Sequence, residues 1–255
     1  MTYAARFVSI ALSNQVPEAD SGATDVFWFH HAGGGLNALT AQARRARPQH
    51  AVRLWSAKMP CREDMSDITF DGSLIELARL LADRIIAVHP ADRPLVIVGH
   101  SFGSVMAYQV TRRLVECGLI PTRLVVSSFP PPDQWERERE LHQVSDEELV
   151  RAVNEQFGGV PQDVMSDPEA LKFFLPPMRF DFALMESYRH PPDGEPLDVP
   201  LTAICGTDDR AVDLAEMQGW SRLTKSTFRL RGMPGDHFFP LQRMGEVLDV
   251  ATWGV

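Results

Sequence analysis

A serine between two glycines is the strongest chemical signal in this chain. Residues 99–103 read Gly-His-Ser-Phe-Gly and directly follow the apolar run Leu95–Val98. In a G-x-S-x-G elbow, the serine lies on a tight strand-to-helix turn, and the glycines leave room for strained backbone and a closely packed helix. A helix is expected over 104–117, where apolar residues offer one face. The pattern predicts Ser101 as the nucleophile of an acyl-transfer reaction.

A serine hydroxyl is a poor nucleophile at neutral pH, so it needs a base and an acid that orients the base. With this elbow, the partners are expected in the chain order serine, acid, histidine. His237 lies in a loop after a late strand and is the predicted base. Asp208 and Asp209 adjoin at the end of the strand before it. We favour Asp209, because a Gly-x-x-Asp turn commonly delivers the acid at this position, and Asp208 remains the alternative.

The tetrahedral intermediate also needs two hydrogen-bond donors for its oxyanion, each typically worth about 3–4 kcal/mol. The backbone N–H of Phe102, directly after the nucleophile, is the first expected donor. The second should come from the glycine-rich loop 32–35, with Ala32 as the first choice and Gly33 as the second. A phosphate-binding role for this loop is disfavoured, because the G-x-G-x-x-G spacing and a Walker lysine are both missing.

The elements that position these residues alternate between strands and helices. The pattern predicts an α/β fold with a mostly parallel central sheet and helices on both faces. A helix is expected over 72–88, and the ligand crevice should lie at the carboxyl edge of the sheet. Strands are expected at 26–29, 52–55, 95–98, 124–126, 201–205 and 227–230.

The interval 130–196 interrupts this alternation. It opens with three consecutive prolines and carries helical patterns at 146–157 and 168–174, each preceded by a capping residue, Ser145 and Asp167. We interpret the interval as a helical lid inserted into a single domain spanning 1–255.

Composition excludes several classes of protein. The 255 residues include 44% hydrophobic residues, enough for a sizeable core, and carry a net charge of −9. Nucleic-acid binding is disfavoured, because phosphates require a concentrated positive surface. An apolar run of about 18 residues and a secretory signal are both missing, so we expect a cytoplasmic protein without membrane contact.

Cysteines and histidines outside the predicted triad are expected to be structural. Cys61, Cys117 and Cys205 lack C-x-x-C spacing and are expected to be reduced and mostly buried. His30 and His31 have no cysteine or carboxylate at ligand spacing beside them, so no metal site is expected.

The sequence resembles the stand-alone type II thioesterases of polyketide and nonribosomal peptide biosynthesis, within the α/β-hydrolases. The resemblance extends from about Asp25 to Pro240 and rests on segments 29–34, 99–103, 175–182 and 235–239. The elbow is shared by many hydrolases. The lid signature, Arg179-x-Asp181-Phe182 followed by Glu186-x-Tyr188, is more selective.

The resemblance implies an editing enzyme. Such enzymes remove aberrant or stalled acyl and aminoacyl groups from the phosphopantetheine arm of acyl or peptidyl carrier domains. The substrate carries the phosphopantetheine, so no cofactor of the enzyme is implied. For Met178, Phe180 and Phe182 of the lid, two roles stay open: binding of the acyl group and packing in the core of the lid. Arg179 with the apolar surface of the lid would contact the carrier.

Two other functions use the same residues. A carboxylesterase or lipase would act on free esters with the same triad, and a catalytically silent relative would only bind a carrier. The complete Ser-Asp-His set argues against the silent protein, and the lid signature argues against the esterase.

Overall fold

A seven-stranded sheet forms the centre of the described part of the chain, with strand order β1-β3-β2-β4-β5-β6-β7. The computed structural model describes residues 3–13, 22–135, 140–158, 160, 165, 167–191 and 194–254. Only β1 pairs in the antiparallel sense among these strands. The strands are β1 (Phe7–Ile10), β2 (Thr24–Phe29), β3 (Val52–Ala57), β4 (Leu95–His100), β5 (Arg123–Ser127), β6 (Leu201–Gly206) and β7 (Phe228–Met233).

The inner strands are apolar because helices cover both sides of the sheet. Every residue of β2, β4, β5 and β6 is buried, as expected for parallel strands covered on both faces. The predicted α/β fold and its six strands are confirmed. The antiparallel edge strand β1 was not predicted, because four residues give too short a pattern to stand out from a loop.

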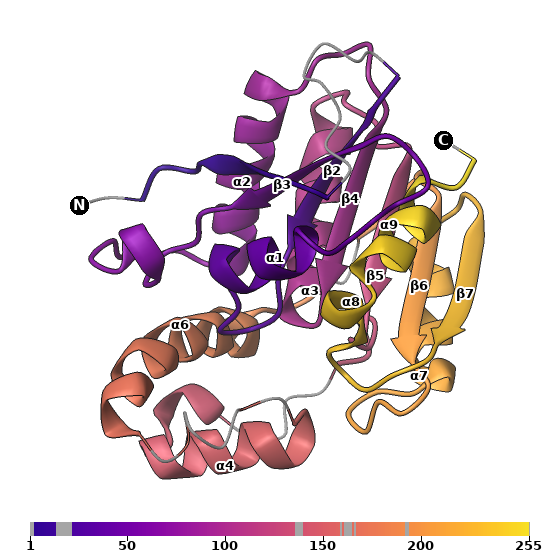
Figure 1. Cartoon of the computed structure of the whole chain (residues 1–255). Helices are drawn as coiled ribbons and strands as arrows, with labels where there is room; N and C mark the ends of the chain where they lie inside the picture. Colours follow the sequence, from indigo (N-terminus) through magenta and orange to yellow (C-terminus); the bar gives the residue numbers. More distant parts are fainter. Residues whose placement is uncertain are drawn as a thin grey trace.

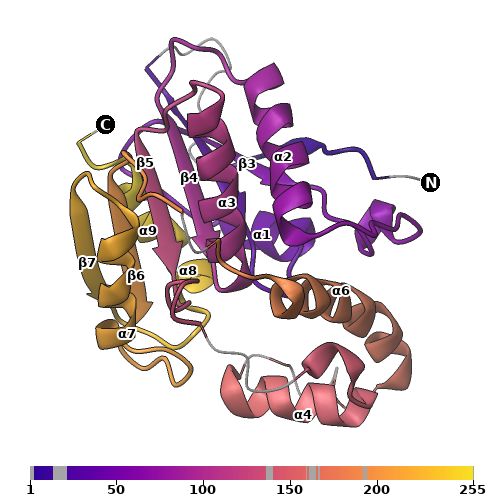
Figure 2. The ribbon, with the colours of Figure 1, turned by 180° about the vertical axis from the view of Figure 1, so that it is seen from behind.

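Helices lie in two layers around this sheet (Figure 1, and from behind in Figure 2). Helices α2 and α3 cover one face and pack against each other, whereas α1, α8 and α9 cover the other. Their bounds are α1 (Leu36–Ala43), α2 (Leu74–Val88), α3 (Phe102–Glu116), α7 (Leu214–Gln218), α8 (Phe239–Gln242) and α9 (Met244–Thr252), with 3₁₀ turns η1 (Glu63–Met65) and η3 (Gly219–Leu223).

The lid consists of η2 (Leu141–Gln143), α4 (Asp146–Gln156) and α6 (Pro168–Ser187), which follow β5 and precede β6. Both views place α4 and α6 beyond the carboxyl ends of the strands. The predicted caps form: Ser145 Oγ accepts a hydrogen bond from the Glu148 N–H, and Asp167 Oδ1 accepts one from the Glu169 N–H.

Helix α6 is longer than its predicted range, 168–174. Pro176 and Pro177 lie inside the helix, where a proline removes a backbone donor and crowds the preceding turn. The helix nevertheless continues to Ser187. Its apolar side chains remain buried at helical spacing on both sides of the prolines, at Leu175, Met178, Phe182 and Met185. Packing against the body therefore outweighs the local propensity.

One cysteine prediction is wrong. Cys205 is buried and Cys61 is half-buried, but Cys117 is exposed. Cys117 is the C-cap residue directly after α3, so it lies beyond the buried face of that helix. Within the described residues, no helix has both the length and the apolar character needed to cross a membrane.

A buried ionic network lies at the amino ends of the strands, the edge opposite the lid. The Asp25 carboxylate accepts hydrogen bonds from Arg53 Nε (2.8 Å) and Trp55 Nε1 (2.9 Å), and it pairs with His89 Nδ1 (2.9 Å). Burial opposes ionisation of Asp25, but the bonds to His89, Trp55 and Arg53 outweigh it and lower the pKa of Asp25.

We expect Asp25→Asn to lower the free energy of unfolding at pH 7 by about 3–5 kcal/mol, the usual cost of removing one partner from a buried pair. Folding lowers the pKa of Asp25 from an unfolded value of about 3.9. The stabilisation by the ionised Asp25 carboxylate is therefore complete above about pH 3.9, and it disappears as the pH falls through the folded pKa. Urea unfolding of parent and variant should therefore show a difference in the free energy of unfolding that is constant from pH 7 to about pH 4 and narrows as the pH falls further toward pH 3. Asp83→Asn, which removes an exposed ion pair to Arg113, is the control, with an expected loss below about 1 kcal/mol. A gap that stays constant down to pH 3 would contradict the prediction.

Candidate active site

Ser101 lies on a sharp turn between β4 and α3. Its backbone has φ 54° and ψ −124°, and its N–H donates to the Ser127 carbonyl oxygen at 2.7 Å. A Cβ at Gly99 would lie 2.1 Å from the Gly103 oxygen, and one at Gly103 would lie 2.2 Å from the Phe29 oxygen. Both glycines of the elbow are therefore required by close backbone approach rather than by flexibility.

Asp209 contacts His237 from the end of the neighbouring strand. Asp209 follows β6 and His237 follows β7, and His237 Nδ1 lies 3.0 Å from Asp209 Oδ2 and 3.2 Å from Oδ1. Burial favours the neutral acid, but the hydrogen bond and charge of His237 outweigh it and lower the pKa of Asp209. The adjoining Asp208 is exposed. Of the two acids considered, the structure places Asp209 against the histidine.

Ser101 and His237 line the same small pocket, of about 40 Å³. The Phe157 ring lies 4.8 Å from the His237 ring, and the Phe238 ring lies 5.3 Å from it. The remaining lining residues are His31, Ala32, Phe129, Val153, Met178, Phe182 and Met185. Most of these side chains are apolar, so few polar groups other than His31 and His237 surround the serine, which strengthens polar interactions inside the pocket.

The structure brings two of the three proposed acyl-binding residues to the serine. Met178 and Phe182 line its pocket. Phe180 does not line it, and packs half-buried against the hydrophobic core. Phe157 and Phe238 were not predicted here, because an isolated aromatic residue in a loop or at a helix end carries no local signal of its role.

Further histidines surround His237 but remain uncharged. The His100 ring lies 5.2 Å from the His237 ring, and His31 lies 5.7 Å from His100. Burial, together with His30, His237 and Arg62, lowers the pKa of His31 to about 3, and burial lowers that of His100 well below its usual value. These rings therefore bring no positive charge to the site. Among the described residues, no group of three potential metal ligands gathers.

Two backbone donors remain for an oxyanion. Phe102 is the first residue of α3, where the N–H groups lack partners within the helix. In the glycine loop, the Gly33 N–H donates to Asp181 Oδ2 at 2.8 Å. Gly33 is therefore occupied, and Ala32, which lines the pocket, is the better of the two predicted donors.

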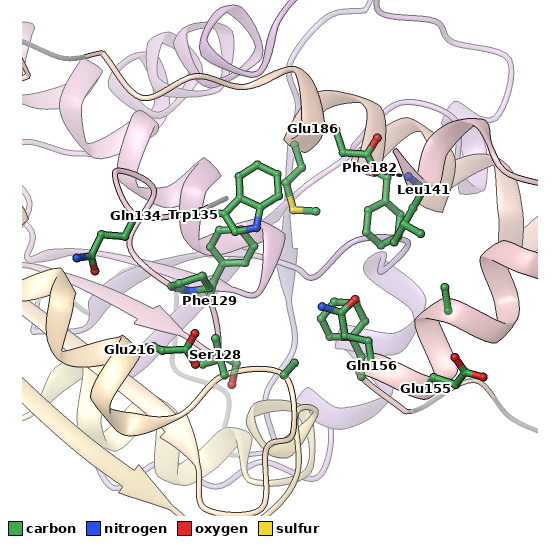
Figure 3. Close-up of a pocket in the computed structure, with 16 residues that line it drawn as sticks. Ser128, Phe129, Gln134, Trp135, Leu141, Glu155, Gln156, Phe182, Glu186 and Glu216 are labelled. Atoms are coloured by element: carbon green, nitrogen blue, oxygen red, sulfur yellow. Dashed lines mark hydrogen bonds between the residues drawn. The ribbon is translucent and has the colours of Figure 1, made fainter. Parts of the chain in front are cut away.

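A larger cavity of about 640 Å³ opens beside the serine pocket. The two share the walls Phe129, Phe157, Phe182 and Met185. Figure 3 shows Phe129 and Trp135, from the loop after β5, lying across the cavity from Phe182 and Leu141 of the lid. Lid residues form part of its wall, and the space is large enough for an elongated ligand that extends from the serine pocket.

Two residues of the lid signature attach the lid to the rest of the molecule. Asp181 pairs with Arg62, and the Tyr188 hydroxyl accepts a hydrogen bond from Gln109 Nε2 at 2.6 Å. Glu186 instead joins α6 to η2 within the lid, because it accepts a hydrogen bond from the Leu141 N–H at 2.7 Å. Arg179 holds the lid together internally, since it donates to Asp146 and to the His142 carbonyl oxygen.

The fold and the nucleophile elbow define a hydrolase of the α/β class. Comparison with known proteins identifies its family. The thioesterase domain family matches residues 24–252, so the chain belongs to the thioesterase family.

Individual relatives come from biosynthetic pathways. The probable cadicidin biosynthesis thioesterase of Streptomyces griseus is 31% identical over 229 residues, which make up 90% of this chain but 62% of the relative. The gramicidin S biosynthesis protein GrsT of Aneurinibacillus migulanus is 26% identical, over 88% of this chain and 86% of the relative.

A solved structure shows the same architecture. The type II thioesterase BorB from the borrelidin biosynthetic cluster superimposes with a TM-score of 0.78 at 28% identity, covering 95% of each chain. The resemblance to type II thioesterases is thus confirmed. A free-ester hydrolase and a silent binding protein are both disfavoured by these similarities.

Proposed function

We propose that this thioesterase hydrolyses acyl and aminoacyl thioesters on the phosphopantetheine arm of carrier domains, and so clears stalled synthases. The contact between His237 and Asp209, beside Ser101 in a lid-covered pocket, carries the proposal. The pathways named for the cadicidin, gramicidin S and borrelidin proteins support this choice of substrate. The phosphopantetheine arrives with the substrate, and the reaction requires no cofactor of the enzyme.

In the first half-reaction, Ser101 Oγ bonds to the thioester carbon while His237 Nε2 takes the hydroxyl proton. The N–H groups of Ala32 and Phe102 receive the oxyanion, and collapse expels the thiolate, which takes the proton from His237. Water then attacks the acyl-enzyme with the same histidine as base and releases the acid. Asp209 orients the ring and stabilises its cationic form.

The lid provides both the acyl-binding surface and the docking surface in this proposal. Met178 and Phe182 contact the acyl group. Arg179 was expected to contact the carrier, but its bonds to Asp146 and His142 engage its guanidinium within the lid. We therefore assign the principal apolar contact to Phe173 of α6, whose exposed fraction is 81%. The carriers implied are acidic and this chain carries a net charge of −9, so long-range attraction does not guide docking.

We expect kcat/KM for an acyl-carrier substrate to exceed that for the same acyl group on N-acetylcysteamine by about tenfold or more, corresponding to about 1.4 kcal/mol. Phe173→Ser should reduce turnover of the carrier substrate and leave the small thioester unaffected. Ile120→Ser is the matched control, because Ile120 has an exposed fraction of 54% but precedes β5, at the edge of the sheet away from the lid.

Steady-state kinetics on both substrates, with a p-nitrophenyl ester of equal chain length for comparison, tests the proposal. Equal kcat/KM values for carrier and small thiol would refute carrier recognition, and preference for the ester would refute the thioesterase assignment.

A further inference from the structure

A buried ion pair connects the lid helix to the glycine loop beside the nucleophile. The exposed fraction of Asp181 is 0% and that of Arg62 is 5%. The contact is bidentate: Arg62 Nη2 lies 2.6 Å from Asp181 Oδ1, and Arg62 Nη1 lies 2.9 Å from Oδ2. Asp181 belongs to α6 and Arg62 directly precedes η1. The pair therefore joins segments that are far apart in the sequence.

Both partners also bind the glycine loop. Asp181 Oδ2 accepts a hydrogen bond from the Gly33 N–H at 2.8 Å, and Arg62 Nη1 donates to the Gly34 carbonyl oxygen at 2.5 Å. The side chain of Arg62 is held in turn by the Pro60 carbonyl oxygen, which accepts from Nε at 3.1 Å. Two adjacent residues of the loop are thus fixed by one buried pair.

The hydrogen bonds from the Asp181–Arg62 pair to Gly33 and Gly34 determine the orientation of the peptide group that carries the Ala32 N–H. The Gly34 N–H donates at 3.0 Å to the His31 carbonyl oxygen, which belongs to the same planar peptide group as the Ala32 N–H. Gly33, between them, has φ +75°, a conformation natural to glycine. Fixing Gly33 and Gly34 therefore fixes the direction in which the Ala32 N–H points.

The lid helix also packs directly on this turn. A Cβ at Gly33 would lie 3.3 Å from Met178 Cβ. Met178 and Asp181 are three residues apart on α6 and so share one helical face. This helix face therefore contacts the glycine loop twice, through Met178 and through Asp181.

A buried ion pair is a weak source of net stability, because desolvation offsets the attraction of the charges. We propose that Asp181 is a positioning residue for the oxyanion hole: together with Arg62, it holds the Gly33–Gly34 turn so that the Ala32 N–H points at the developing oxyanion when the lid is in place. The inference rests on the proposed function, since Ala32 acts there as an oxyanion donor.

The effect should concentrate in kcat. When Ser101 Oγ bonds to the thioester carbon, the carbonyl π electrons move to oxygen and the hydroxyl proton moves to His237. A misdirected Ala32 N–H leaves this charge without one donor, whereas ground-state binding changes little. Loss of one oxyanion donor typically lowers kcat by about 10²–10³-fold.

Two variants separate positioning from simple structural support. Asp181→Asn keeps the size of the side chain but places an uncharged amide against Arg62. The double variant Arg62→Met/Asp181→Leu replaces the pair with apolar side chains, a change that is often neutral or stabilising, but leaves the Gly33 N–H without its acceptor. With an acyl-N-acetylcysteamine thioester, we expect kcat about 10²-fold lower in Asp181→Asn, with KM within about threefold. The double variant should be more stable than Asp181→Asn, which leaves Arg62 as a buried unpaired charge, and should remain slow.

An inhibitor comparison measures the oxyanion hole without turnover. A trifluoromethyl ketone that forms a tetrahedral adduct at Ser101 should lose affinity for Asp181→Asn by a factor similar to the loss in kcat. A methyl ketone of the same chain length, which remains trigonal, should bind both enzymes alike. Asp146→Asn, which removes the ion pair to Arg179 inside the lid, is the control and should match the parent in both measurements.

Each outcome decides the inference. Recovery of kcat together with stability in the double variant would show a purely structural role, and unchanged kcat in Asp181→Asn would overturn the proposal outright. If the double variant does not fold, the inhibitor comparison in Asp181→Asn tests the proposal instead. Equal losses of affinity for the trifluoromethyl ketone and the methyl ketone would then refute the positioning role of Asp181. Failure of the parent enzyme to hydrolyse any thioester would instead refute the proposed function.

Discussion

Ser101→Ala is expected to lower kcat for an acyl thioester by about 10⁶-fold, the scale of loss when a serine-hydrolase nucleophile is removed. Among the described residues that line the serine pocket, only Ser101 carries a hydroxyl group. Without this hydroxyl, no acyl-enzyme forms. Mass spectrometry after treatment with a fluorophosphonate should show one adduct, on the peptide containing residues 99–103, and none in the variant.

The fold of this variant should survive. Alanine and serine are similar in size, and each bears a single Cβ at the strained φ of 54°, so the thermal unfolding midpoint should change by only a few degrees. An adduct on a different serine, with Ser101→Ala still active, would show that the elbow is not the reactive site.

The second large effect concerns the acid. Asp209→Asn should lower kcat by about 10⁴-fold, as when a triad carboxylate becomes an amide and the histidine tautomer is wrong. The carboxylate now accepts from His237 Nδ1 at 3.0 Å, and an amide nitrogen facing that atom would compete with this donor. Steady-state kinetics on a small thioester measures the loss directly.

Asp208→Asn is the matched control for this variant. Asp208 adjoins Asp209 but is exposed, so we expect kcat within about threefold of the parent, as for a surface substitution away from the site. A large loss in Asp208→Asn with normal turnover in Asp209→Asn would mean that the histidine changes partner during the reaction.

Local chemistry determined the fold and the position of the nucleophile. The close backbone approach around Ser101 leaves no room for a Cβ at Gly99 or Gly103. This requirement therefore appears in the sequence as a pattern of five residues. Buried parallel strands appear as short apolar runs, and helix starts at Ser145 and Asp167 are marked by a side chain that caps its own helix. Each of these signals depends on neighbours in the sequence, which is why the order of strands and helices was predictable.

The partners across the molecule were decided by tertiary structure alone. The Gly-x-x-Asp turn favours Asp209 over Asp208, but only the packing of β6 beside β7 brings the Asp209 carboxylate to His237 Nδ1, at 3.0 Å. Helix α6 continues through Pro176 and Pro177 because its apolar face is buried against the body, a contribution that local propensity does not contain. Asp181 and Arg62 are 119 residues apart, so neither residue type nor spacing indicates their pairing. Such long-range contacts arise only when the folded chain removes both groups from water and leaves each charge with the other as its partner.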